Sequence, residues 1–147
     1  MGAAGLADLV SLAAEENYLV VVSTARADGS IQSSVVNAGP VAHPLDGSPA
    51  LAFVTYGPAK LAHLRARPWL TVTARHGWRW AAAEGTARII GRDDPAPGVD
   101  AERLRLQLRE IFAAAGGTHD DWDGYDAEMR AQGRAAVLLT PTRVYSN

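Results

Sequence analysis

Residues 18–38, YLVVVSTARADGSIQSSVVNA, give the clearest indication of the fold. The β-branched run at 18–24 predicts a strand, and Asp28-Gly29 predicts a tight turn into a second strand at 31–38. Two strands joined by a tight turn are antiparallel. The fold is therefore expected to be built from hairpins rather than from parallel strands joined by helices.

The rest of the chain extends this pattern. The proline- and glycine-bearing connection at 39–49 is expected to be a loop, and Glu84-Gly85 predicts a bulge in a long strand. Further strands are expected at 50–55, 69–75, 78–90 and 135–145, and helices at 5–16, 58–67, 100–115 and 120–132. The prediction is a mainly β fold with flanking helices: a six-stranded antiparallel split β-barrel in one domain over residues 1–147.

Composition excludes several classes of partner and chemistry. The chain has 147 residues, a net charge of −2 at pH 7 and no cysteine. It therefore has no basic field for nucleic acid or an anionic membrane, and no apolar run approaches the roughly 20 residues of a membrane span. The absence of cysteine excludes disulfides and thiol chemistry and fits a cytoplasmic protein.

The motifs of several enzyme classes are missing. There is no G-x-G-x-x-G after the first strand, no Walker loop, no H-E-x-x-H and no G-x-S-x-G. The four histidines are scattered without the spacing of paired ligands, so no metal site is expected. The acidic stretch 120–124 lacks the ligand pattern of a calcium loop, and helix capping accounts for it better.

Lys60 is the only lysine, against thirteen arginines. Gly57-Pro58 turns the chain into the helix at 58–67, and Pro58 suits its first position. Lys60 then lies in the first turn, beside unpaired backbone N–H groups and the positive end of the helix dipole. A cation is unfavourable there unless an anion shares the site, which a phosphate would do. The alternative is a solvated surface lysine.

The second strand carries polar side chains on both faces. Gln32 and Ser34 share one face, whereas Ser33 and Asn37 share the other. One face must meet something other than hydrocarbon, which is either water at an edge strand or a flat heteroaromatic ring with a phosphate-bearing tail. In the long strand, Trp78 and Trp80 are followed by small residues and predict an apolar shelf, for a ring, for core packing or for a subunit interface.

These features occur together in a known family. The chain resembles the pyridoxamine-phosphate-oxidase-like split β-barrel proteins, and within them the actinobacterial branch that uses the deazaflavin coenzyme F420. Four segments carry the resemblance, in the family's order: 28–34, 59–68, 77–87, and 119–123 together with 142–145.

The resemblance implies a homodimer with the cofactor in a groove between the two barrels. It implies that Lys60 contacts the cofactor phosphate and that the tryptophans stand at the cleft wall. The cofactor-binding positions it implies are Gln32, Ser33, Ser34, Asn37, Lys60, Trp78 and Trp80.

The implied activity is hydride transfer from reduced F420 to an electron-poor small molecule. The cofactor performs the difficult step while the protein orients it, so no catalytic triad is needed. No catalytic residue is assigned, because Tyr56, His76 and solvent are all candidate proton donors. Two alternatives stay open: an FMN-dependent oxidase or reductase on the same barrel, and a flavin- or deazaflavin-binding protein without turnover.

Overall fold

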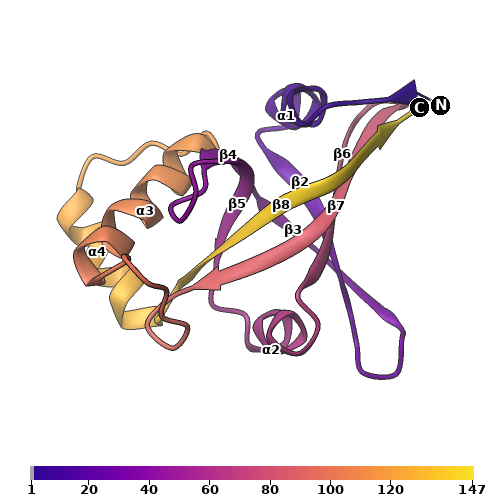
Figure 1. The fold of residues 1–147 in the computed structure, drawn as a ribbon. Helices are drawn as coiled ribbons and strands as arrows, with labels where there is room; N and C mark the ends of the chain where they lie inside the picture. Colours follow the sequence, from indigo (N-terminus) through magenta and orange to yellow (C-terminus); the bar gives the residue numbers. More distant parts are fainter. Residues whose placement is uncertain (1) are drawn as a thin grey trace.

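The computed structural model describes residues 2–147 and is dominated by one antiparallel sheet (Figure 1). Hydrogen bonds order its strands β3-β2-β6-β7-β8-β5-β4, with β1 beside β8. The strands are β1 Gly2–Ala3, β2 Leu19–Ala25, β3 Ile31–Asn37, β4 Gly39–Ala42, β5 Pro49–Thr55, β6 Trp69–His76, β7 Arg79–Ile90 and β8 Ala135–Ser146.

The first hairpin has the predicted turn. Val22 lies opposite Ser34 in the β2–β3 pair. Gly29 takes a φ of 86°, a value that favours glycine, and the Ser30 amide donates to Asp28 Oδ1 at 2.9 Å. The Asp-Gly signal thus fixes the turn that places β3 beside β2.

The bulge expected at Glu84-Gly85 is confirmed, since the β7–β8 register shifts there. A Cβ at Gly85 would overlap the carbonyl of Thr140, so the backbones approach too closely for a larger residue. The bulge lies midway along the two longest strands, where it lets the sheet bend.

One face of the sheet encloses the first core. Helix α1 (Leu6–Glu15) contributes Leu9, Leu12 and Ala13, and α2 (Pro58–Ala66) contributes Leu61 and Leu64. Figure 1 shows α1 and α2 near opposite ends of the sheet. The apolar positions of both helices recur at helical spacing, which explains why each packs one side against the strands.

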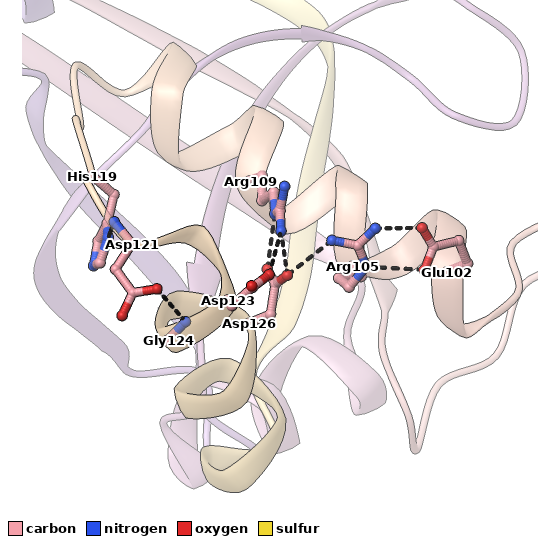
Figure 2. Close-up of polar contacts among 8 residues, drawn as sticks. All are labelled: Glu102, Arg105, Arg109, His119, Asp121, Asp123, Gly124 and Asp126. Carbon is pink, nitrogen blue, oxygen red and sulfur yellow. Dashed lines mark hydrogen bonds and ion pairs between the residues drawn. The ribbon is translucent and has the colours of Figure 1, made fainter.

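A second core lies on the other face of the sheet, under α3 (Ala101–Ala114) and α4 (Trp122–Gln132). Strand β8 serves both cores: Ala136 and Leu138 face this one, whereas Val137 and Leu139 face the first. Burial on both sides explains the continuous apolar run at 135–139. The acidic stretch does cap α4, since Asp121 Oδ1 accepts from the Gly124 amide at 3.0 Å (Figure 2).

The predicted number of six strands is too low, because the described residues contain eight strands. Residues 39–49, expected to be a loop, begin with β4, whose residues alternate between buried and exposed. Pro40 is compatible with this strand because β4 is at the edge of the sheet, where one side needs no ladder hydrogen bonds. The other addition, β1, is a two-residue pairing with the end of β8.

Candidate functional site

The N-terminus of α2 follows β5 and lies beside the first core. We call this region the α2 corner. Pro58 stands at the first helical position after Gly57, which provides no side-chain cap. The first amide to donate into the helix is that of Leu61, to the Gly57 carbonyl at 3.1 Å. The amides of Ala59 and Lys60 therefore precede the first intrahelical bond, at the positive end of the helix dipole.

Lys60 lies in this first turn, as expected, and is half-buried. Its Nζ lies 5.5 Å from the centroid of the Phe53 ring, whose side chain is buried in the first core. Burial lowers the pKa of the Lys60 ammonium below its ordinary value. Within the described part of the chain no carboxylate lies within 4.0 Å of it, so a partly desolvated cation has no anionic partner.

One turn further along α2, a hydrogen bond ties the helix to β2. Thr24 is 3% exposed, and its Oγ1 lies 3.1 Å from Nδ1 of His63. Lys60 and His63 are three residues apart and so lie on neighbouring parts of the helix surface. The helix thus turns Lys60 toward β5 and His63 toward β2.

Gln32 lies directly opposite Thr24 in the β2–β3 pair, so the two side chains share a face of the sheet about 5 Å apart. Gln32 Oε1 is buried and has no hydrogen-bond partner in the described residues. Ser34 follows on the same face, opposite Val22. An unpaired acceptor of this kind is costly unless a donor, such as a ligand or water, completes it.

The alternation predicted for β3 is confirmed, and it separates the four polar candidates. Gln32 and Ser34 are half-buried on the inner face, whereas Ser33 and Asn37 are exposed on the outer face. Ser33 Oγ lies 3.0 Å from Ser23 Oγ, and Asn37 Nδ2 donates to the Asn17 carbonyl at 3.0 Å. The outer pair is therefore already hydrogen-bonded within the chain.

The two tryptophans lie at the other end of the sheet. Trp78 is 94% exposed in the β6–β7 turn, and Trp80 packs edge-on against Tyr145 with ring centroids 6.0 Å apart. Lys60 Nζ lies over the Phe53 ring on β5, and the positions paired with Phe53 across the sheet are Val137 on β8 and Ile89 on β7. Trp80 is nine residues from Ile89 along β7, roughly 30 Å at about 3.3 Å per residue, so one chain does not bring the tryptophans to Lys60.

An apolar outer face covers the same edge of the sheet as Ser33 and Asn37. We call it the β2–β3–β6 face; its large exposed side chains are Leu19, Val21, Ile31, Val35 and Trp69. Val21 and Val35 are directly paired. An apolar patch of this extent on an otherwise polar surface is typical of an interface.

The candidate proton donors also lie apart. His76 Nδ1 lies 2.8 Å from Glu16 Oε1, at the tryptophan end of β6. Tyr56 follows β5, and the guanidinium of Arg134 stacks 4.1 Å above its ring. Of the two, only Tyr56 is near the α2 corner. Sequence reasoning missed Thr24 and His63; the spacing of His63 three residues after Lys60 was the available signal.

The family model for pyridoxamine 5'-phosphate oxidase matches residues 10–147. This chain belongs to the pyridoxamine 5'-phosphate oxidase family.

Solved structures share the fold of this family member. A conserved hypothetical protein from Mycobacterium tuberculosis matches with a TM-score of 0.68 and 17% identity, over 97% of this chain and 84% of that one. An F420 reductase matches at 0.62 and 16%, over 97% of both chains. A pyridoxamine 5'-phosphate oxidase-related, FMN-binding protein from Nostoc punctiforme matches at 0.64 and 15%, over 96% and 80%.

Beyond the family, one negative finding concerns the helices. No helix within residues 2–147 has the length and apolar character needed to cross a bilayer.

Proposed function

We propose that this chain is an oxidoreductase that binds the deazaflavin cofactor F420 through its phosphate and transfers hydride to an electron-poor small molecule. The observation that carries the proposal is Lys60: a half-buried ammonium at an uncapped helix N-terminus, with no carboxylate partner among residues 2–147. Both the ammonium and the free amides favour a bound anion. Family membership and the fold shared with an F420 reductase support the same reading.

The residues present fit such a group. Lys60 and the amides before the first helical bond would hold the phosphate. The buried Oε1 of Gln32, which has no hydrogen-bond partner in the part of the chain that the structure describes, would accept a hydrogen bond from a ring N–H or a hydroxyl of the cofactor, with Ser34 beside it on the same face. The bound cofactor supplies the hydride chemistry, and this corner positions it and excludes water.

A homodimer would complete the site. The β2–β3–β6 face offers an apolar surface for a second copy, and Ser33 and Asn37 lie on it. Trp78 and Trp80 are roughly 30 Å or more from Lys60 along the sheet of one chain, so their proposed place at the cleft wall requires a partner subunit to supply them. The exposed Trp78 is suited to this because its ring has no packing partner of its own.

FMN is the alternative cofactor, because it also joins a phosphate to a flat ring and a related FMN-binding protein shares the fold. The colour of the purified protein separates the two. A bright yellow protein with flavin fluorescence favours FMN, whereas a colourless protein that binds added deazaflavin favours F420.

Turnover is tested by stopped-flow mixing of the protein loaded with reduced deazaflavin against a panel of enones and quinones. We expect at least one acceptor to reoxidise the bound cofactor faster than the free cofactor. Tight binding without reoxidation by any acceptor would favour the alternative of a non-catalytic binding protein. Failure to bind either cofactor would contradict the proposal.

A further inference from the structure

A cavity of about 490 Å³ lies between α3, α4 and the segment that follows β7. We call it the α3–α4 cavity. It is separate from the face that joins Gln32, Thr24 and His63, and none of the seven candidate cofactor-binding residues lines it. Its volume falls in the range of pockets that enclose small organic molecules.

The inner wall of the α3–α4 cavity is apolar. Its apolar lining side chains come from the end of β7, from the segment after it and from both helices: Ile90, Pro95, Val99, Leu104, Leu108 and Met129. A ligand that fits this wall must present hydrocarbon or an aromatic body, since each buried CH₂ contributes about 0.8 kcal/mol.

Two of the three acidic side chains of the lining, Glu102 and Asp126, are paired with arginines (Figure 2). Asp126, which is 8% exposed, accepts from Arg105 Nη1 at 2.8 Å and from Arg109 Nε at 2.9 Å. Glu102 binds the other side of Arg105, with Arg105 Nε 2.9 Å from its Oε2. Asp100 caps α3 by accepting from the Arg103 amide at 2.8 Å.

Three other arginines of the lining have no such partners. No carboxylate in the described residues lies within 4.0 Å of Arg92, Arg130 or Arg134, although all three line the cavity. Arg92 rests against the backbone of Gly133, whereas Arg134 donates to Gln132 Oε1 at 2.7 Å and stacks over the Tyr56 ring. The lining therefore holds four arginines against three carboxylates, a formal charge of +1, and Arg92 and Arg130 provide exposed guanidinium groups without a carboxylate partner in the described residues.

We propose that the α3–α4 cavity is a second binding site, for a small amphipathic carboxylate. The apolar body would lie against the wall between α3 and α4, and the carboxylate would meet the unpaired arginines. The planar guanidinium fork matches a carboxylate with two parallel hydrogen bonds. A phosphate monoester on an apolar body shares the anionic chemistry, so the experiment compares the two head groups.

The test is isothermal titration calorimetry of the full chain with decanoate, below the concentration at which it forms micelles. Decanoate should bind the wild type, and Arg92→Gln and Arg130→Gln should each weaken binding about tenfold or more, the scale of a lost charge-assisted bond. Arg103→Gln is the matched control, because Arg103 is an exposed arginine of α3 outside the lining. It should leave the affinity unchanged.

Three further ligands define the chemistry. Decanol lacks the charge and acetate lacks the apolar body, so both should bind at least about tenfold more weakly than decanoate. Decyl phosphate binding more tightly than decanoate would overturn the choice of a carboxylate.

Leu104→Trp, which fills the cavity, should abolish decanoate binding while thermal unfolding confirms that the variant folds.

The proposal is overturned if decanoate does not bind the wild type, or if both arginine variants bind it as tightly as the wild type does. Equal binding of acetate or decanol would also overturn it. Cofactor titrations of Arg130→Gln should match those of the wild type, because Arg130 lies outside the α2 corner. The two proposals can therefore fail independently.

Discussion

Replacing Asp126 by Asn tests the ion network that joins α4 to α3. The carboxylate is 8% exposed and bridges Arg105 and Arg109. The hydrogen bond from Arg109, reinforced by that from Arg105, lowers the pKa of Asp126 to about 2. Asparagine keeps the size of the side chain but removes the charge that both arginines require.

The magnitude follows from the pKa. A decrease from 3.8 to about 2 corresponds to about 2.4 kcal/mol, at about 1.36 kcal/mol per pH unit. Arg105 and Arg109 are 30% and 25% exposed, so solvent screening reduces the expected loss of stability to about 1–2 kcal/mol. Because the folded-state pKa is depressed, this stability is present above about pH 4 and is lost as the pH falls through about 2.

Urea unfolding at about pH 7 and at about pH 2.5 measures the difference. The midpoint of Asp126→Asn should fall below that of the wild type at the higher pH, and the gap should shrink in acid. Asp123→Asn is the control: its exposed carboxylate lies 4.0 Å from Arg109, so its midpoint should stay close to that of the wild type. Equal midpoints for Asp126→Asn and the wild type at about pH 7 would refute the reasoning, as would a gap that persists in acid.

Three other predictions concern the interface, the corner and the packing of α3. Val35→Glu places a charge in the middle of the exposed β2–β3–β6 face, so the proposed dimer should become a monomer by light scattering; an unchanged mass would exclude that face as the interface. Burial lowers the pKa of Lys60, so cofactor affinity should decrease as the pH rises from about 7 to about 10 in fluorescence titrations, whereas Lys60→Arg should hold its affinity. A pH-independent wild type would contradict that role. Gly39→Ala should destabilise the fold by about 1–3 kcal/mol in urea unfolding, because its Cβ would overlap the backbone of Ala114. Gly57→Ala is the control and should be tolerated, because its Cβ would make only an ordinary van der Waals contact. Equal losses of unfolding free energy for the two variants would argue against the close approach of Gly39 to Ala114.

Much of the fold could be predicted because its signals are local. The hairpin at 18–38 combines strand-forming residues with an Asp-Gly turn, and both appear in the structure. Helix 58–67 was predicted from the Gly57-Pro58 turn and from the fit of Pro58 to a first helical position, and α2 begins at that residue. Strand β4 was missed because Gly39 and Pro40 indicate a loop, and only its edge position makes a strand acceptable there.

The site was harder to predict because it depends on tertiary contacts. The position of Lys60 in a first turn follows from the sequence, but the contact between Thr24 and His63 requires knowing how α2 lies against β2. The strand pattern placed Trp80 on β7 without showing that it lies far from α2 within one chain. The α3–α4 cavity could not be predicted from the sequence, because four separate segments contribute its lining residues.

The most direct test of the proposed anion site is calorimetry of the wild type and Lys60→Ala with F420 and FMN in parallel. The wild type should bind one of the two cofactors, and Lys60→Ala should weaken that binding by about 1–3 kcal/mol, the scale of a charge-assisted hydrogen bond. Lys60→Arg, which keeps the charge, should retain most of the affinity. Identical binding curves for the wild type and Lys60→Ala would contradict the assignment of this ammonium to the cofactor phosphate.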